Sequence, residues 1–138
     1  MTTEEREAFL ADLHVGVFSV VGDGDTPLTA PIWYSYEPGG TVNVIIGRTS
    51  LKAKALARTA AFSLCAQAEA LPYKYVTVEG PVTVTEPATL EERTAMAVRY
   101  LGEELAVGYI ASTGGEQSDS IVVRMQPARW RTTDYGKS

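Results

Sequence analysis

The sequence contains few of the residues on which metal and nucleophilic chemistry depend. Its 138 residues include one histidine, His14, and one cysteine, Cys65. One of each cannot build a metal cluster, and no Cys-x-x-Cys or His-Glu-x-x-His motif occurs. Gly-x-Ser-x-Gly is absent too, so a catalytic triad through His14 has no supporting motif. We therefore interpret His14 as structural and Cys65, in an apolar run, as a small buried hydrophobe.

The sequence also lacks an excess of positive charge and any long apolar run. Twelve Lys and Arg residues stand against seventeen Asp and Glu, for a net charge of -5. Proteins that neutralise phosphate backbones present a basic face, so nucleic acid is not an expected partner. The longest apolar stretch, residues 15–21, is far shorter than the roughly 20 residues of a membrane-spanning helix. With no signal-like segment after Met1, we expect a cytoplasmic protein and no membrane partner.

The residues that are present predict short helices and strands in one domain, residues 1–138. The 45% hydrophobic content fits a single core. Capping residues predict helices that begin near Thr2, Ser50 and Thr89 and end near residues 13, 58 and 101. Strand composition is found at residues 14–21, 28–36, 41–47, 60–67, 73–85 and 119–133, the last bent at Pro127. Residues 112–118, rich in Gly and Ser, are expected to form a mobile loop.

The order of these elements predicts a mainly β (α+β) fold. Turn signals such as Gly-Asp-Gly-Asp at 22–25 and Pro-Gly-Gly at 38–40 join the early strands directly, as in antiparallel hairpins. Many half-buried strands in a small chain favour closure of the sheet into a barrel, because closure removes exposed edges. We therefore expect an antiparallel barrel with two to three flanking helices.

The strongest local signal for ligand binding is Gly-Arg-Thr-Ser-Leu-Lys-Ala-Lys at residues 47–54. A buried strand runs into a helix start there, where free backbone N–H groups and the positive end of the helix dipole attract anions. Arg48, Ser50 and Lys52 add a guanidinium, a hydroxyl and an ammonium group. From these residues alone two interpretations stay open: a phosphate-binding site, or a capped surface helix with solvated charges.

Aromatic residues form a second signal, Ala-Pro-Ile-Trp-Tyr-Ser-Tyr at residues 30–36. Proline within a strand fits a sheet edge or a place where a ligand lies against the backbone. Trp33, Tyr34 and Tyr36 offer flat faces to a ring system, although filling the barrel is the more common role of such residues. Weaker signals are Pro-Tyr-Lys-Tyr-Val-Thr-Val-Glu-Gly at 72–80 and Trp-Arg-Thr-Thr-Asp-Tyr at 130–135.

In this order, the segments resemble the pyridoxamine 5'-phosphate oxidase-like, FMN-binding split-barrel superfamily, and most closely its actinobacterial deazaflavin (coenzyme F420)-dependent reductases. The resemblance extends from the N-terminal helix to the Trp130 strand. Its most specific part is Arg-Thr-Ser-Leu-Lys-Ala-Lys followed by Tyr-Lys-Tyr-Val-Thr-Val-Glu-Gly. It implies an antiparallel split β-barrel, a homodimer whose two chains assemble the cofactor pockets, and a flavin or deazaflavin cofactor.

The resemblance also implies which residues bind the cofactor. In the family, a Ser-x-Lys at the helix start holds the cofactor phosphate, which corresponds here to Ser50 and Lys52, with Arg48 beside them. By the same resemblance, Pro31, Ile32 and Trp33 form the strand under the ring system, and the backbone of Ile46 and Gly47 flanks the phosphate. Tyr75 corresponds to a residue that touches the isoalloxazine, and Trp130 to one at the dimer pocket. Lys54 and Lys74 offer charges to an anionic tail.

Two departures separate the chain from the FMN-using oxidases. The strand at residues 29–34 lacks the arginine and lysine that hold FMN in those proteins, and the C-terminal Arg-x-His-Asp-Arg motif of the pyridoxamine oxidases is absent. Vitamin B6 oxidation is therefore not expected, and the resemblance favours coenzyme F420 over FMN. The implied reaction is hydride transfer from C5 of reduced F420 to a small conjugated acceptor, such as a quinone or a linear tetrapyrrole.

Two alternatives stay open. One is an FMN-binding split-barrel oxidoreductase, and the other is a non-catalytic protein that binds a flavin or haem. Haem capture requires an axial ligand, for which His14 is the only histidine. No residue stands out as catalytic: Tyr34, Tyr36 and Tyr75 are candidate proton donors by residue type, and solvent is another source.

Overall fold

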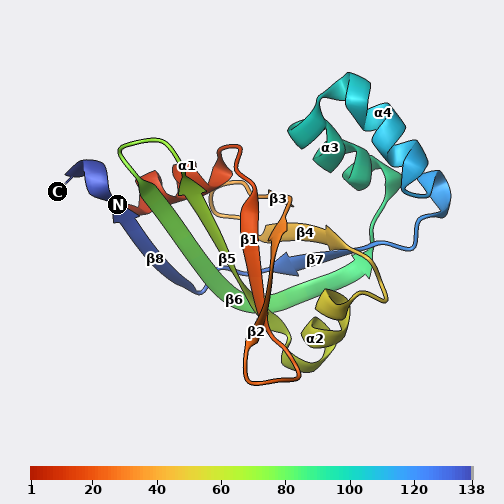
Figure 1. Cartoon of the computed structure of the whole chain (residues 1–138), viewed down its shortest axis with the longest axis horizontal. Coiled ribbons are helices and arrows are strands. Elements are labelled where there is room, and N and C mark those ends of the chain that lie inside the picture. Colours follow the sequence, from red (N-terminus) through yellow and green to blue (C-terminus); the bar gives the residue numbers. More distant parts are fainter. Residues whose placement is uncertain (138) are drawn as a thin grey trace.

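The fold is built on one curled antiparallel sheet, seen in a computed structural model that describes residues 1–137 (Figure 1). The eight-stranded sheet has the order β2-β1-β5-β6-β7-β4-β3, and β8 also pairs with β6. The strands are β1 (Gly16–Val21), β2 (Pro27–Ile32), β3 (Tyr34–Ser35), β4 (Val42–Ile46), β5 (Ala61–Ala68), β6 (Lys74–Pro87), β7 (Ile121–Met125) and β8 (Arg129–Asp134). The helices are α1 (Thr3–Ala11), α2 (Leu51–Thr59), α3 (Leu90–Leu101) and α4 (Glu103–Ser112), with 3-10 turns at Gly115–Gln117 and Tyr135–Lys137.

Strand β6 joins the two halves of the sheet. Its first half pairs with β5 and β8, and its second half pairs with β7 after a register shift between Val82 and Val84. A bulge of this kind bends a strand and increases its twist. Gly80 lies at the bend, where a β-carbon would overlap the backbone carbonyl of Gln126. Because only glycine permits this approach, the β7–β8 connection can cross β6 there and close the barrel.

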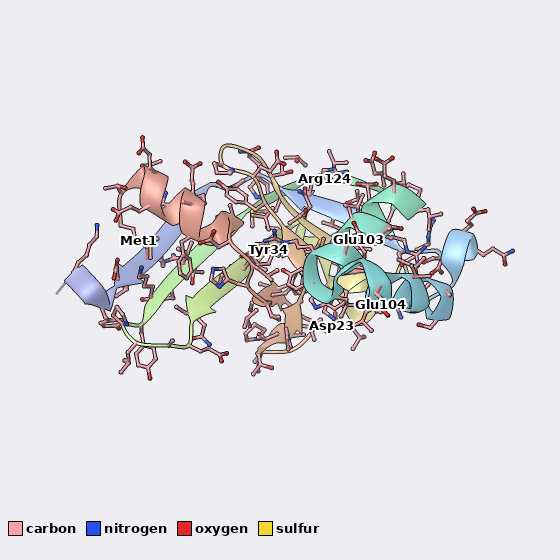
Figure 2. All side chains as sticks on the ribbon, turned by 90° about the horizontal axis from the view of Figure 1, so that it is seen from above. Met1, Asp23, Tyr34, Glu103, Glu104 and Arg124 are labelled. Carbon is pink, nitrogen blue, oxygen red and sulfur yellow. The ribbon has the colours of Figure 1, made fainter. Side chains whose placement is uncertain are left out.

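The core consists of alternate side chains on the inner face of the sheet together with one face of α1 and α2. Leu10 of α1 and Phe18, Leu64 and Val78 of the strands are fully buried. Tyr34, also fully buried, donates a hydrogen bond from its hydroxyl to the Leu10 carbonyl at 2.7 Å. Figure 2 shows Tyr34 between α1 and the α3–α4 hairpin, so this residue ties the barrel to both.

The predicted antiparallel barrel is confirmed, and the three predicted helix starts are confirmed as well. Side chains of Thr2, Ser50 and Thr89 each accept a backbone N–H at a helix N-cap, and Glu5 and Glu92 complete two capping boxes. These signals are local, because they join residues three positions apart. That is why the sequence predicts them correctly.

Two of the predicted strands are in fact divided. The strand predicted at residues 28–36 breaks at Trp33 into β2 and β3, which pair with β1 and β4 respectively. The strand predicted at residues 119–133 breaks at 126–128 into β7 and β8, so Pro127 lies in a connection between strands. The single prediction was wrong in both cases because each half pairs with a different part of the sheet.

The prediction missed α4, which makes four helices where two to three were expected. Gly102 at its N-cap makes no side-chain capping bond, and Gly108 lies inside the helix, so neither usual signal is present. The predicted loop at 112–118 is largely structured, since Ser112 ends α4 and Gly115–Gln117 forms a 3-10 turn. In Figure 1, α3 and α4 form a hairpin at the end of the molecule away from both termini.

His14 and Cys65, which the sequence predicted to be structural and buried, differ in how well the structure fits these predictions. The Nε2 atom of His14 lies 3.0 Å from the Phe9 carbonyl and its ring stacks on that of Phe9, so His14 makes structural contacts. Cys65 is only partly buried, which corrects the predicted core position. Its register opposite Val17 and Thr77 sets it on the outer sheet face, while neighbouring Leu64 and Ala66 face the core.

None of the helices in residues 1–137 is long and apolar enough to cross a membrane. Within the same residues, no group of three or more His, Cys, Asp and Glu side chains is arranged to hold a metal ion.

Candidate functional site

A pocket of about 450 Å³ lies between one edge of the barrel and the α3–α4 hairpin. Its volume is in the range of small-molecule sites. Pro31, Ile32 and Trp33 line it from the end of β2, and Ile46 and Gly47 line it from the end of β4. The helical side is formed by Arg93, Met96 and Ala97 of α3, Tyr109 of α4, and Thr113 just after it. The structure thus brings together five of the residues that the sequence indicated for a cofactor.

Trp33 occupies the break between β2 and β3, and its ring turns toward the helices. The ring stacks on Tyr100 with centroids 5.0 Å apart and planes at 5°, and it lies 5.1 Å from Tyr109 at 45°. The barrel-filling interpretation is therefore correct for Tyr34 and Tyr36, which are buried in the core, and not for Trp33.

Hydrogen bonds from α3 hold the strand break in place. The Tyr100 hydroxyl donates to the His14 carbonyl at 2.6 Å and accepts the backbone N–H of Tyr34 at 3.1 Å. Arg99 donates to the Tyr34 carbonyl at 3.2 Å and to the carbonyls of Ala11 and Asp12 at the end of α1. The backbone of Tyr34, directly after Trp33, is thereby anchored to α3, and stacking on Tyr100 orients the Trp33 ring.

The connection from β4 to α2 carries the cations. Ser50 is the N-cap: its hydroxyl accepts the Ala53 N–H at 3.1 Å and donates to the Gly47 carbonyl at 2.8 Å. The Arg48 Nε donates to the Asp119 carbonyl at 3.3 Å, which places it beside Ser120 at the pocket wall. Within residues 1–137, Lys52 forms no ion pair with a carboxylate. Neither Arg48 nor Lys52 lines the pocket, and their charges are available to an anion at the start of α2, next to Gly47 of the pocket wall.

The chain is similar to known proteins in its three-dimensional structure and not in its sequence. No family model matches the sequence, and no curated protein does. A solved structure described as an F420 reductase has 18% identity and a TM-score of 0.75, covering 91% of this chain and 94% of its own. The conserved hypothetical protein Rv2991 from Mycobacterium tuberculosis has 21% identity and a TM-score of 0.77, covering 99% and 87%. A putative pyridoxamine 5'-phosphate oxidase from Listeria innocua has 17% identity and a TM-score of 0.67, covering 94% and 96%. The fold is a split barrel.

In this split barrel, seven of the residues indicated by the sequence do not line the pocket: Arg48, Ser50 and Lys52 around the start of α2, and Lys54, Lys74, Tyr75 and Trp130. Lys54 lines a separate hollow of about 300 Å³ between α2 and the β1–β2 hairpin. Lys74 and Tyr75 pair with Asp134 and Thr133 at the far end of β6. Trp130 packs against the core, edge-on to Tyr36 at 6.1 Å and beneath the Arg6 guanidinium at 4.6 Å.

The tyrosines of the barrel interior are poorly placed as proton donors. The Tyr36 hydroxyl donates to a Glu7 carboxylate oxygen at 3.1 Å, and burial raises the pKa of Tyr36 to about 12. Burial also raises the pKa of Tyr34, whose hydroxyl is bonded to Leu10. Neither residue lines the pocket. The candidates named by residue type are therefore not supported for Tyr34 and Tyr36, and Tyr109 is the tyrosine that lines the split-barrel pocket.

The residues that sequence reasoning missed come from α3, α4 and the segment after them. Tyr109 and Thr113 were missed because α4 was not predicted. Arg93 lies three and four positions before Met96 and Ala97, so a cation stands on an otherwise apolar helix face. That spacing was a usable signal for a charged residue directed toward the split barrel.

Proposed function

We propose that this chain is an oxidoreductase that binds coenzyme F420 and uses its reduced form to reduce a small conjugated acceptor. One observation carries the proposal: the pocket has a flat strand-end floor at Pro31–Trp33, and at Gly47 it reaches the strand-to-helix connection that bears Arg48 and leads to Lys52 in the first turn of α2. Similarity of fold to an F420 reductase supports it. So do the Arg-Thr-Ser-Leu-Lys-Ala-Lys residues at positions 48–54.

The residues present fit an anionic, planar cofactor. Arg48 and Lys52 supply charge-assisted donors beside the backbone of Gly47, each worth about 1.5–3 kcal/mol with a phosphate. The Ser50 hydroxyl is engaged with its own helix, so its part is to cap α2 and present the N-terminal N–H groups. The apolar surface of Ile32 and Trp33 suits a ring system.

The chain's own contribution to the reaction is binding and orientation. When bound, reduced F420 supplies a hydride, and the acceptor gains it together with one proton. Trp33, held by Tyr100, fixes the floor of the pocket, and the α3–α4 hairpin shields its helical side from water. Such positioning brings reacting atoms to about 3–3.5 Å, which is the main demand of hydride transfer.

We also infer a homodimer that uses the outer face of the sheet. Cross-strand register aligns Pro31, Val17, Cys65 and Thr77 in one row across β2, β1, β5 and β6. These side chains are small or apolar, and Val17 and Val21 are 39% and 65% exposed. The row continues from the pocket floor at Pro31, and Tyr75 lies on the same face two residues before Thr77. Tyr75 therefore lies on the face that a second copy would cover.

The haem alternative has no support from the placement of His14. Its Nε2 is engaged with the Phe9 carbonyl, and the residue does not line the pocket. Titration of the protein with F420 and with FMN distinguishes the proposed function from the FMN alternative. We expect F420 to bind more tightly than FMN, measured by fluorescence quenching, and reduced F420 to be consumed in the presence of quinone acceptors. Tighter binding of FMN, with FMN co-purifying from the expression host, would overturn the F420 assignment.

A further inference from the structure

The pocket has an unusual charge balance for this protein. The chain carries a net charge of -5, yet no Asp or Glu within residues 1–137 lines the pocket. In the described part of the chain, Arg93 is the one cationic residue of the lining, on the helical side and opposite the strand ends that form the floor. Around it the wall is aromatic and apolar, with Tyr109, Met96 and Ala97. The pocket is therefore electropositive in an acidic molecule.

The Arg93 side chain is buried without a counter-ion. It is 7% exposed, and within residues 1–137 no carboxylate lies within 4.0 Å of it. Its guanidinium donates to neutral acceptors: the Gly115 carbonyl, the Thr113 carbonyl at 3.2 Å and the Thr113 hydroxyl at 3.1 Å. Glu92, its neighbour in sequence, is bound to Arg124 at 2.5 Å.

These hydrogen bonds give Arg93 a structural part, because they fasten α3 to the end of α4. Carbonyls at a helix C-terminus also offset part of a positive charge through the helix dipole. Holding α3 to the end of α4 requires only hydrogen-bond donors and no net charge, since a neutral side-chain amide also donates to carbonyls. A buried cation without an acid is costly, and an anion supplied by a ligand removes that cost.

We propose that the α3–α4 side of the pocket binds the acceptor substrate, that this substrate carries a carboxylate on a flat apolar body, and that Arg93 recognises the carboxylate. The inference rests on the proposed function and names its substrate class. The apolar body lies against Tyr109 and Met96, and the cofactor ring lies on the Pro31–Trp33 side. A guanidinium binds a carboxylate with charge-assisted, directional hydrogen bonds, which makes Arg93 a specificity-determining residue.

The first test uses the unmodified protein and two probes of the same shape, 2-naphthoate and its neutral counterpart 2-naphthamide. Isothermal titration calorimetry measures the affinity of each. We expect the carboxylate to bind about 10- to 100-fold more tightly, the effect of one charge-assisted hydrogen bond. Equal affinity for the two probes, or a preference for the amide, overturns the proposal. This test does not depend on whether a variant folds.

Variants then assign the preference to one residue. Arg93→Gln is expected to abolish the preference for the carboxylate, and Arg93→Lys to keep part of it, because it keeps the charge without the planar fork. Arg58→Gln is the matched control, since Arg58 forms an exposed pair with Asp23 and does not line the pocket. If Arg93→Gln folds and weakens both probes equally, Arg93 acts only as a fastener and the proposal fails.

Repeating the titrations with saturating oxidised F420 separates this inference from the proposed function. We expect the carboxylate preference to persist with the cofactor bound, because cofactor and acceptor occupy different sides of the pocket. Displacement of 2-naphthoate by F420 overturns the separate acceptor site. If F420 does not bind at all while the carboxylate preference and its dependence on Arg93 remain, the F420 function is wrong and the acid-binding site stands.

Discussion

The ring of Trp33 lies parallel to the ring of Tyr100, with centroids 5.0 Å apart and an angle of 5° between the planes. These residues are 67 positions apart in the chain, yet Tyr100 also receives the Tyr34 backbone N–H and donates to the His14 carbonyl. Helix α3 thus sets the geometry of the β2–β3 break. Together with the Arg99 bond to the Tyr34 carbonyl, this contact positions the pocket floor.

Tyr100→Phe and Tyr100→Leu separate the two parts of that contact. Loss of the hydroxyl in Tyr100→Phe should cost about 1–2 kcal/mol of unfolding free energy, because the Tyr34 N–H and His14 carbonyl lose their partner. Tyr100→Leu removes the stacking on Trp33 as well, so we expect it to bind F420 more weakly than Tyr100→Phe does. Urea unfolding and cofactor titration measure the two effects. Tyr73→Phe, at an exposed position, is the control; equal F420 affinity in all variants contradicts a role for the stack.

Lys52→Ala should weaken F420 binding by about 10- to 100-fold, since one charge-assisted bond is lost. Stability should change by less than about 0.5 kcal/mol, because Lys52 has no ion pair to lose within residues 1–137. Lys54→Ala is the matched comparison, with a smaller expected effect because Lys54 lines a different hollow. Fluorescence titration measures the F420 affinity of both variants. An unchanged affinity in Lys52→Ala means that Lys52 is only a solvated charge on the helix surface.

Val17→Asp should convert the proposed dimer to a monomer. A stable homodimer interface buries about 2,000 Å² or more, and a charge at the middle of its apolar row is left without a partner. Light scattering at micromolar concentration measures the change in mass. Val107→Asp carries the same substitution on exposed α4 and should leave the dimer intact. A wild-type protein that is monomeric under these conditions contradicts the proposed dimer.

Gly80→Ala should destabilise the fold by about 1–3 kcal/mol, the usual cost of overpacking. The added methyl overlaps the Gln126 carbonyl, so the crossing of β6 by the β7–β8 connection has to open. Gly24→Ala is the control, because nothing lies within 4 Å of its β-carbon position. Thermal unfolding of both variants checks the expectation, and equal melting temperatures show that the crossing tolerates a side chain.

Local signals explain what could be predicted. The helix starts at Thr2, Ser50 and Thr89 were predictable because an N-cap bond joins residues three positions apart. Strand composition at residues 73–85 likewise predicted β6, which runs from Lys74 to Pro87. The strand-to-helix segment at 47–54 was recognisable for the same reason, since its parts are adjacent in the chain.

The sequence by itself determined the helix caps, the antiparallel barrel and the residues from which a ligand site could be made. The tertiary structure alone decided which of them meet. It set Trp33 and Gly47 in one pocket, kept Lys74 and Trp130 away from it, and added Arg93 of α3 together with Tyr109 of α4, a helix with no side-chain capping signal. The physical reason is that sheet register and helix packing join residues far apart in the chain. Their energies depend on partners that no local window contains.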